Sequence, residues 1–335
     1  MDPFTQGVVG AAFGQLKGSA QTLAKAAIIG ALAGMAADLD ILIRSSEDPL
    51  LALQFHRHFS HSLLFIPIGA LLCAVFFHYA FAHRRWGFSF NQTYSWSLIG
   101  YATHALLDGC TSYGTQLLWP LTNHRFAWDF IAVIDPAFTL PAFILVLTTA
   151  IKKQRRWALM AIAWMAVYMV LAGWQHQRAL AQVHALAAQR GHTPERISAK
   201  PTLGNLVLWK TLYLHQGAFY INGIKVGLFG KNAVWQGESV PALIVARDFP
   251  ELAPHSQQLH DIQRFHWFSD GYTALDPNNN QRIIDLRYSI LPHKSTPLWA
   301  IEIDPSKGHT EHVKYIPANH GDPATGAIFF KLLFE

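Results

Sequence analysis

Residues 52–64 read ALQFHRHFSHSLL and stand at the start of an apolar run that continues to residue 82. His56, His58 and His61 lie at the N-terminal end of this run. The run is long enough to cross the roughly 30 Å hydrocarbon core of a bilayer. An ionisable side chain inside a membrane segment normally has a partner or a function. The stretch is therefore either a membrane boundary that happens to be rich in histidine or part of a metal site.

The composition divides the chain into two parts. Hydrophobic residues make up 51% of it and charged residues 14%, against about 25% charged residues in an average soluble protein. Most of this shortfall lies before residue 178, whereas the last third has ordinary polarity and frequent turn residues. The net charge of +5 is not arranged as a basic stripe with interleaved aromatic residues, so nucleic acid is not an expected partner.

We therefore expect an α-helical polytopic membrane domain with about five apolar spans and a short N-terminal helix, followed by a small mainly-β soluble domain. The expected spans are residues 28–43, 62–82, 94–119, 130–151 and 157–174, and the short helix covers residues 4–16. The predicted domains are the membrane domain (1–178), a helical linker (179–202) and the β-rich domain (203–335). Within the last, GLFGKN (227–232) is predicted to be a hairpin turn between strands of β-branched and aromatic residues.

Basic residues orient these spans. One cluster (83–85) follows the second span and another (152–156) follows the fourth, and loops rich in lysine and arginine stay on the cytoplasmic side of a membrane. This places the C-terminal domain in the periplasm. It also brings one set of carboxylates and imidazoles to the outer face of the membrane: Asp38, Asp40, His56, His58, His61, His104, Asp108 and Asp135.

The spacing of these residues favours a shared ion. His104 and Asp108 are four residues apart, and therefore lie on one face of a helix. Imidazole and carboxylate groups together suit zinc, iron or manganese. Asp38 and Asp40 are two residues apart, and such a pair can bridge two ions. The alternative is a buried hydrogen-bond network or a set of helix caps, neither of which needs an ion.

Several other polar residues have alternative interpretations. Arg57 either pairs with an aspartate or receives an anionic group of a substrate. Asp135 precedes Pro136, so it either caps the following helix or supports the metal site. The histidines of the C-terminal domain lack tight ligand spacing and are predicted to be surface residues: His255, His260, His266, His293, His309, His312 and His320.

Five motifs follow one another in the first half of the chain: MDPFTQGVVGAAFG (1–14), AADLD (36–40), HRHFSHSLL (56–64), THALLDGCTSYGTQLLWP (103–120) and RFAWDFIAVIDP (125–136). Together they resemble the membrane-bound, YdjM/YbcI-like metal-dependent hydrolases of bacterial inner membranes. The resemblance is close over residues 1–150 and looser beyond them. That family is itself remotely similar to zinc-dependent phospholipase C and P1 nuclease. The resemblance implies a multi-pass protein of the inner membrane.

The resemblance also implies a ligand set, which comes from an acidic pair, an HR-x-x-x-H element and an H-x-x-x-D element. The implied metal ligands are Asp38, Asp40, His56, His61, His104 and Asp108. His58 lies outside the pattern. Many members read MDPxTH where this chain has Gln6, whose amide oxygen is a weak ligand. The metal position that includes Gln6 is therefore expected to be altered, empty or filled by water.

These residues predict a metal-dependent hydrolase. An ion held by histidines and carboxylates lowers the pKa of its water to about 7 and polarises a phosphoryl or carbonyl oxygen. Zinc is the expected ion, with manganese or iron as alternatives and one to three ions per chain. Asp38, Arg57 and Asp135 are the expected catalytic residues. The partner is the lipid bilayer, and the expected substrate is lipid-borne or periplasmic, such as a phospholipid phosphoester. The alternative is a non-catalytic metal-binding membrane protein or a transporter.

Overall fold

The computed structural model describes residues 1–317 and 323–334, which form two compact units. The first, here called the helical unit, comprises residues 1–42, 55–173 and 203–205. The second, here called the sheet unit, comprises residues 43–54 and 174–202 together with the described residues from 206 onward. The predicted helical linker (179–202) lies in the sheet unit, as do residues 43–54, which the sequence placed in the membrane domain.

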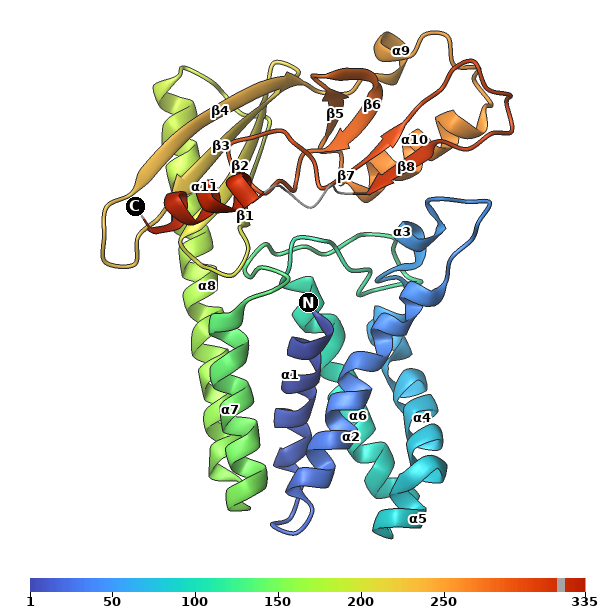
Figure 1. Cartoon of the computed structure of the whole chain (residues 1–335), viewed down its shortest axis with the longest axis vertical. Coiled ribbons are helices and arrows are strands. Elements are labelled where there is room, and N and C mark those ends of the chain that lie inside the picture. The colour runs from blue at the N-terminus through green and yellow to red at the C-terminus, as the bar shows by residue number, and fades with distance from the viewer. Residues whose placement is uncertain (318–322, 335) are drawn as a thin grey trace. The chain divides into compact units, whose positions relative to one another are not determined.

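The helical unit is built from helices α1, α2, α4, α6, α7 and the first part of α8 (Figure 1). Their bounds, with the short connecting helices, are α1 (Pro3–Leu16), α2 (Leu23–Met35), η1 (Ala36–Leu42), α3 (Leu51–Phe55), η2 (Phe59–His61), η3 (Leu63–Phe65), α4 (Ile66–Phe77), η4 (His78–Ala82), α5 (His83–Trp86), α6 (Phe90–Gly109), α7 (Pro136–Lys152) and α8 (Arg156–Gln189). The predicted helix at residues 4–16 is confirmed as α1. It begins where the Asp2 side chain accepts a hydrogen bond from Thr5 N (3.0 Å).

Glycines let three helices of this unit touch through their backbones. A Cβ atom added to Gly10 of α1 would lie 2.3 Å from Gly30 O of α2, and one added to Gly100 of α6 would lie 2.3 Å from the same oxygen. Small residues at helix crossings allow this close approach, which supplies packing where apolar surroundings provide no hydrophobic drive. The crossing holds the end of α2, and η1 after it, beside the second half of α6.

The expectation of about five apolar spans is wrong. Among the described residues, two helices are long and apolar enough to cross a membrane, Leu63–Trp86 and Arg156–Gln189. The other predicted spans contain turns that an apolar run does not reveal. The α-helix of the first ends at Met35, the helix of the third ends at Gly109, and that of the fourth begins only at Pro136.

The sheet unit contains two four-stranded antiparallel sheets, which confirms the mainly-β C-terminal part. The first sheet has the order β1 (Arg196–Pro201), β2 (Leu208–His215), β3 (Ala218–Lys225), β4 (Ala233–Pro241), and the second has β5 (Thr273–Asp276), β6 (Asn279–Asp285), β7 (Trp299–Glu302), β8 (Lys314–Pro317). This unit also holds most of α3 and the last part of α8. Its other helices are α9 (Val245–Asp248), α10 (Gln257–Phe268) and α11 (Pro323–Phe334). The predicted hairpin turn at 227–232 is also confirmed, because Lys225 of β3 pairs with Ala233 of β4.

Apolar clusters hold the sheet unit together, and two of them join its main layers. In one, Leu212 and Phe219 of the first sheet pack with Ile284 of the second. In the other, Val183 of α8 packs against Trp209 of β2, so the C-terminal part of α8 covers one face of the first sheet.

Replacement of Gly30 by alanine should destabilise the helical unit, because the new methyl group would meet the backbone oxygen of Gly10 at 2.3 Å. We expect a loss of about 1–3 kcal/mol, as for other overpacked sites, seen as a lower midpoint of thermal unfolding in detergent. Gly173→Ala on α8 is the matched control, since nothing lies within 4 Å of the added Cβ. Equal midpoints for the two variants would contradict the role of the glycine crossing.

Candidate metal centre

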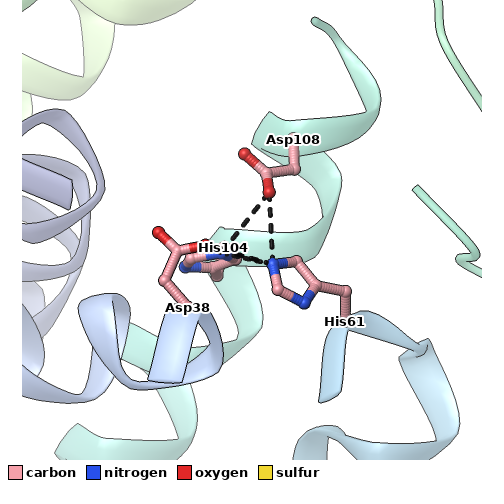
Figure 2. A group of neighbouring side chains, drawn as sticks. All are labelled: Asp38, His61, His104 and Asp108. Carbon is pink, nitrogen blue, oxygen red and sulfur yellow. Dashed lines mark hydrogen bonds and ion pairs between the residues drawn. The ribbon is translucent and has the colours of Figure 1, made fainter. Parts of the chain in front are cut away.

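Four side chains from three segments point at one another in the helical unit (Figure 2). Asp38 comes from η1, His61 from η2, and His104 and Asp108 from α6. The Nε2 atoms of His61 and His104 are 2.8 Å apart, and Asp38 Oδ1 lies 3.4 Å from each. Asp108 Oδ2 lies 3.2 Å from His61 Nε2 and 3.5 Å from His104 Nε2. Three of the side chains are fully buried, whereas that of Asp38 is 16% exposed.

These distances fit the edges of a coordination tetrahedron. Zinc binds imidazole nitrogen and carboxylate oxygen at about 2.0–2.2 Å, so neighbouring ligand atoms of a tetrahedral site are about 3.3 Å apart. The measured separations of 2.8–3.5 Å lie on both sides of this value. Two nitrogen and two oxygen donors of this geometry suit zinc.

The outer nitrogens of both histidines are tied to acceptors. His61 Nδ1 lies 3.1 Å from Asp40 Oδ2, and His104 Nδ1 lies 2.5 Å from the carbonyl oxygen of Gly34. An ionised carboxylate and a carbonyl can only accept, so each Nδ1 carries the donated hydrogen. In the neutral rings this leaves the Nε2 lone pairs directed at the shared centre, which is the arrangement found in metal-binding histidines.

Asp40 organises the loop that carries His61. Its Oδ2 accepts hydrogen bonds from Arg57 N (2.9 Å) and Ser60 Oγ (2.7 Å), and its Oδ1 lies 2.8 Å from His56 Nδ1. Burial raises the pKa of Asp40, but the hydrogen bonds from His56 and His61 outweigh it and hold the pKa well below the usual range. Asp40 therefore stays ionised and positions His61 rather than completing the four-donor group.

The negative charges around His61 favour a positive charge on its ring. Burial by itself lowers the pKa of this imidazole, but the carboxylates of Asp108, Asp38 and Asp40 outweigh burial and raise the pKa to about 10. A proton and a metal ion compete for the same lone pair, so an ion that binds here displaces a proton.

Asp108 is held from several sides. Arg57 Nε lies 3.0 Å from its Oδ2, and the amide nitrogen of Gln6 donates to its Oδ1 over 2.9 Å. The amino group of Met1 also contacts Oδ1. The structure thus brings Gln6 to the centre, where its amide nitrogen supports a ligand-type carboxylate.

The remaining predicted site residues lie in different places. His56 joins Asp38 and Asp40 in a second group of ligand-type atoms next to the first. Arg57 pairs with Asp108, as one of its two interpretations predicted. Asp135 is not brought to either group: its carboxylate caps α7 through the N–H groups of Ala137 and Phe138 and accepts a hydrogen bond from Tyr168 Oη (2.7 Å).

The sequence interpretation missed several supporting residues. Ser60 bonds Asp40 and is itself held through its carbonyl by Tyr101 Oη (2.8 Å). Ser60 stands inside the histidine-rich stretch, where its small hydroxyl was a usable signal. The carbonyl of Gly34 carries no signal in the sequence, because every residue offers the same group.

A further group of ligand-type atoms lies in the sheet unit, where Asp48 and Asp261 meet His312. His312 is one of the histidines predicted to be surface residues, and its side chain is 27% exposed. Arg264 makes ion pairs with both aspartates (2.8 and 3.0 Å), so one of their two negative charges is already offset. His320, predicted to be a surface residue as well, lies outside the described residues.

An apolar helical bundle with a buried histidine–aspartate centre defines the class of protein. The chain belongs to the YdjM inner membrane protein family, whose sequence model matches residues 1–179. This match confirms the resemblance to YdjM proteins and supports a location in the inner membrane. The chain is also similar to YfhP of Bacillus subtilis (strain 168), an uncharacterized protein, with 24% identity over 315 residues that cover 88% of each chain. No solved structure matches the chain.

His61→Ala should remove the ion from the purified protein, because it deletes one donor of four and one of the two imidazole ligands. His58→Ala is the matched control from the same stretch, since the His58 ring contacts Trp119 instead of the centre. Elemental analysis of both variants measures the difference. A full complement of ion in His61→Ala would contradict the assignment.

Asp40→Asn should weaken the centre without abolishing it. The asparagine keeps the shape but loses the charge that holds His61 Nδ1, and loss of such an outer partner lowers metal affinity about 10- to 100-fold. Competition with a chelator of known affinity gives this number. Affinity equal to that of the unaltered protein would show that Asp40 does not orient His61.

Proposed function

We propose that this protein is a membrane-embedded metal-dependent hydrolase that acts on a lipid-borne substrate, with a phosphoester as the bond cleaved. The proposal rests on the convergence of His61, His104, Asp38 and Asp108 on one point, with the Nδ1 atoms of both histidines next to acceptors and their Nε2 atoms facing that point. Membership of the YdjM inner membrane family supports the membrane setting. The remote similarity to zinc-dependent phospholipase C and P1 nuclease stays a prediction.

Each residue of the centre has a distinct part in the proposed reaction. A divalent ion bound there supplies a Lewis acid and lowers the pKa of a coordinated water to about 7. His61, His104 and Asp108 bind the ion, and Arg57 fixes Asp108 and offsets part of its charge. Asp38 is the one partly exposed member of the four, so it would be the ligand that gives way to an entering water. Its freed carboxylate would then lie where it can accept a proton from that water.

Apolar side chains beside the centre favour a substrate delivered from the bilayer. Leu39, between the two aspartates on η1, and Leu42, two residues after Asp40, are 63% and 71% exposed. Leu64, just after the histidine stretch, is 56% exposed. Exposed leucines next to an ion-binding carboxylate suit a molecule with an acyl chain and a charged head. A water-soluble substrate would not need them.

The donor set favours one zinc ion at the four-residue centre. The adjacent group of Asp38, Asp40 and His56 supports a second ion that would share Asp38. Two ions bridged by one carboxylate are the arrangement that hydrolases use to hold both the attacking and the leaving oxygen. Manganese and iron are the alternatives to zinc.

The topology proposed here uses the two helices that are long enough to span. The basic cluster at 83–85 ends the first, and the cluster at 152–156 begins the second. Between them α6 runs toward the His61 end of the first helix and α7 runs back (Figure 1), so both clusters lie on one side of the membrane. Positive residues mark that side as cytoplasmic. The sheet unit, which follows the second helix, would then be periplasmic.

The protein in proteoliposomes with added zinc should hydrolyse a phosphoester lipid, and a panel of phosphomonoester and phosphodiester lipids followed by phosphorus NMR tests this. Asp38→Asn should lower turnover to background while most of the ion remains bound, because His61, His104 and Asp108 still bind the ion. His58→Ala should retain activity, since it leaves the centre intact.

A bound ion without turnover of any lipid in the panel would overturn the hydrolase proposal. It would favour the second candidate, a non-catalytic metal-binding membrane protein.

A further inference from the structure

The membrane-spanning part of α8 ends where the sheet unit begins. About 20 helical residues cross a bilayer, so a span that starts at Arg156 ends near Gln175. Trp174 stands at this point, half exposed, with the guanidinium of Arg178 stacked 4.6 Å from its ring centre. Tryptophan and arginine at the end of an apolar helix are typical of the membrane–water interface.

The hairpin between β3 and β4 is fastened to α8 at this same level. Gln175 Nε2 donates to the carbonyl oxygen of Val226 (2.9 Å), and Arg178 Nη1 donates to that of Gly227 (3.0 Å). The opposite end of β3 lies far along the helix, where His192, just after α8, meets Tyr220. The strands therefore run along α8 with the hairpin tip at its membrane end.

The tip itself is apolar and unprotected. Phe229 is fully exposed, at 103% of its reference area, and Leu228 is 37% exposed. Fully exposed aromatic side chains at a loop tip are characteristic of surfaces that meet a partner or a membrane.

Helix α11 extends this apolar surface. Its buried face, with Phe329 and Leu332, packs against Leu208 and Trp235, and Trp235 lies near the tip end of β4. Its other face exposes large apolar side chains: Ile328 (45%), Phe330 (59%) and Phe334 (78%). In Figure 1, α11 lies against the first sheet at the end where the β3–β4 hairpin turns.

Within the hairpin segment and within α11, the charged residues have one sign. The hairpin segment 225–235 contains Lys225 and Lys231 and no acidic residue, and α11 contains Lys331 and no acidic residue. A surface of aromatic residues flanked by lysine fits the boundary between acyl chains and anionic headgroups. A second copy of the same surface would meet it with like charges.

We propose that the β3–β4 hairpin tip (227–232) and the exposed face of α11 form an interfacial anchor that inserts into the lipid leaflet where α8 leaves the membrane. Its ligand is a bilayer surface that contains anionic lipids. The anchor fixes the sheet unit against the membrane at a second point besides α8, independently of the metal centre and of the hydrolase proposal.

A spin label at position 229 tests the anchor. The full-length chain with Cys73→Ala, Cys110→Ala and Phe229→Cys is labelled with a nitroxide and placed in vesicles of phosphatidylethanolamine and phosphatidylglycerol. Collisions of the label with oxygen, which enters lipid, are compared with collisions with a water-soluble nickel chelate. Lys307→Cys, on an exposed loop of the same unit, is the matched control. We expect the oxygen-to-nickel ratio at 229 to exceed that at 307 severalfold.

Charge reversal gives a second test. Lys231→Glu with Lys331→Glu should lower the ratio at position 229 in vesicles with phosphatidylglycerol and leave it unchanged in vesicles of phosphatidylcholine alone. A label at 229 that meets the nickel chelate as readily as the control would overturn the proposal. So would a label shielded from both reagents, since that would mean that protein covers the tip.

Discussion

The contact that the site depends on is the glycine crossing of α1, α2 and α6. The backbone oxygen of Gly30 is so close to Gly10 and Gly100 that no side chain fits between them. One turn further along α2, the carbonyl of Gly34 accepts the hydrogen bond of His104 Nδ1. The same crossing therefore sets the distance between helices and the direction of a ligand-type imidazole, and η1 begins directly after it.

The centre gathers charge in a buried place, and this requires compensation. Isolated carboxylates without a partner are costly to bury, and the cost is recovered only with good geometry and full hydrogen bonding. Arg57 and Gln6 offset part of the charge of Asp108 and fill part of its hydrogen-bonding capacity. One oxygen of Asp38 and one of Asp108 nevertheless lie close together, facing the two Nε2 atoms. A divalent cation satisfies all four donors at once. The hydrogen bonds and ion pairs made by Asp40, Gly34, Arg57 and Gln6 surround this point, and they would support a bound ion there.

The sequence predicted which residues lie in the centre, but not which of them are donors and which position a donor. The spacing of His104 and Asp108 sufficed because a helix places residues four apart on one face. Asp38 and Asp40 could not be told apart, because their directions depend on the tight turn of η1. The spans were overcounted because an apolar run continues through the ends of helices at Met35 and Gly109. The glycines at 10 and 14 and at 30 and 34 carried a readable signal for the crossing.

X-ray absorption at the zinc edge, on the full-length protein reconstituted with one equivalent of zinc, tests the central claim most directly. The account predicts four nitrogen and oxygen neighbours at about 2.0–2.2 Å, with the outer scattering of two imidazole rings. A spectrum without imidazole scattering, or with six oxygen neighbours as in hydrated zinc, would contradict it.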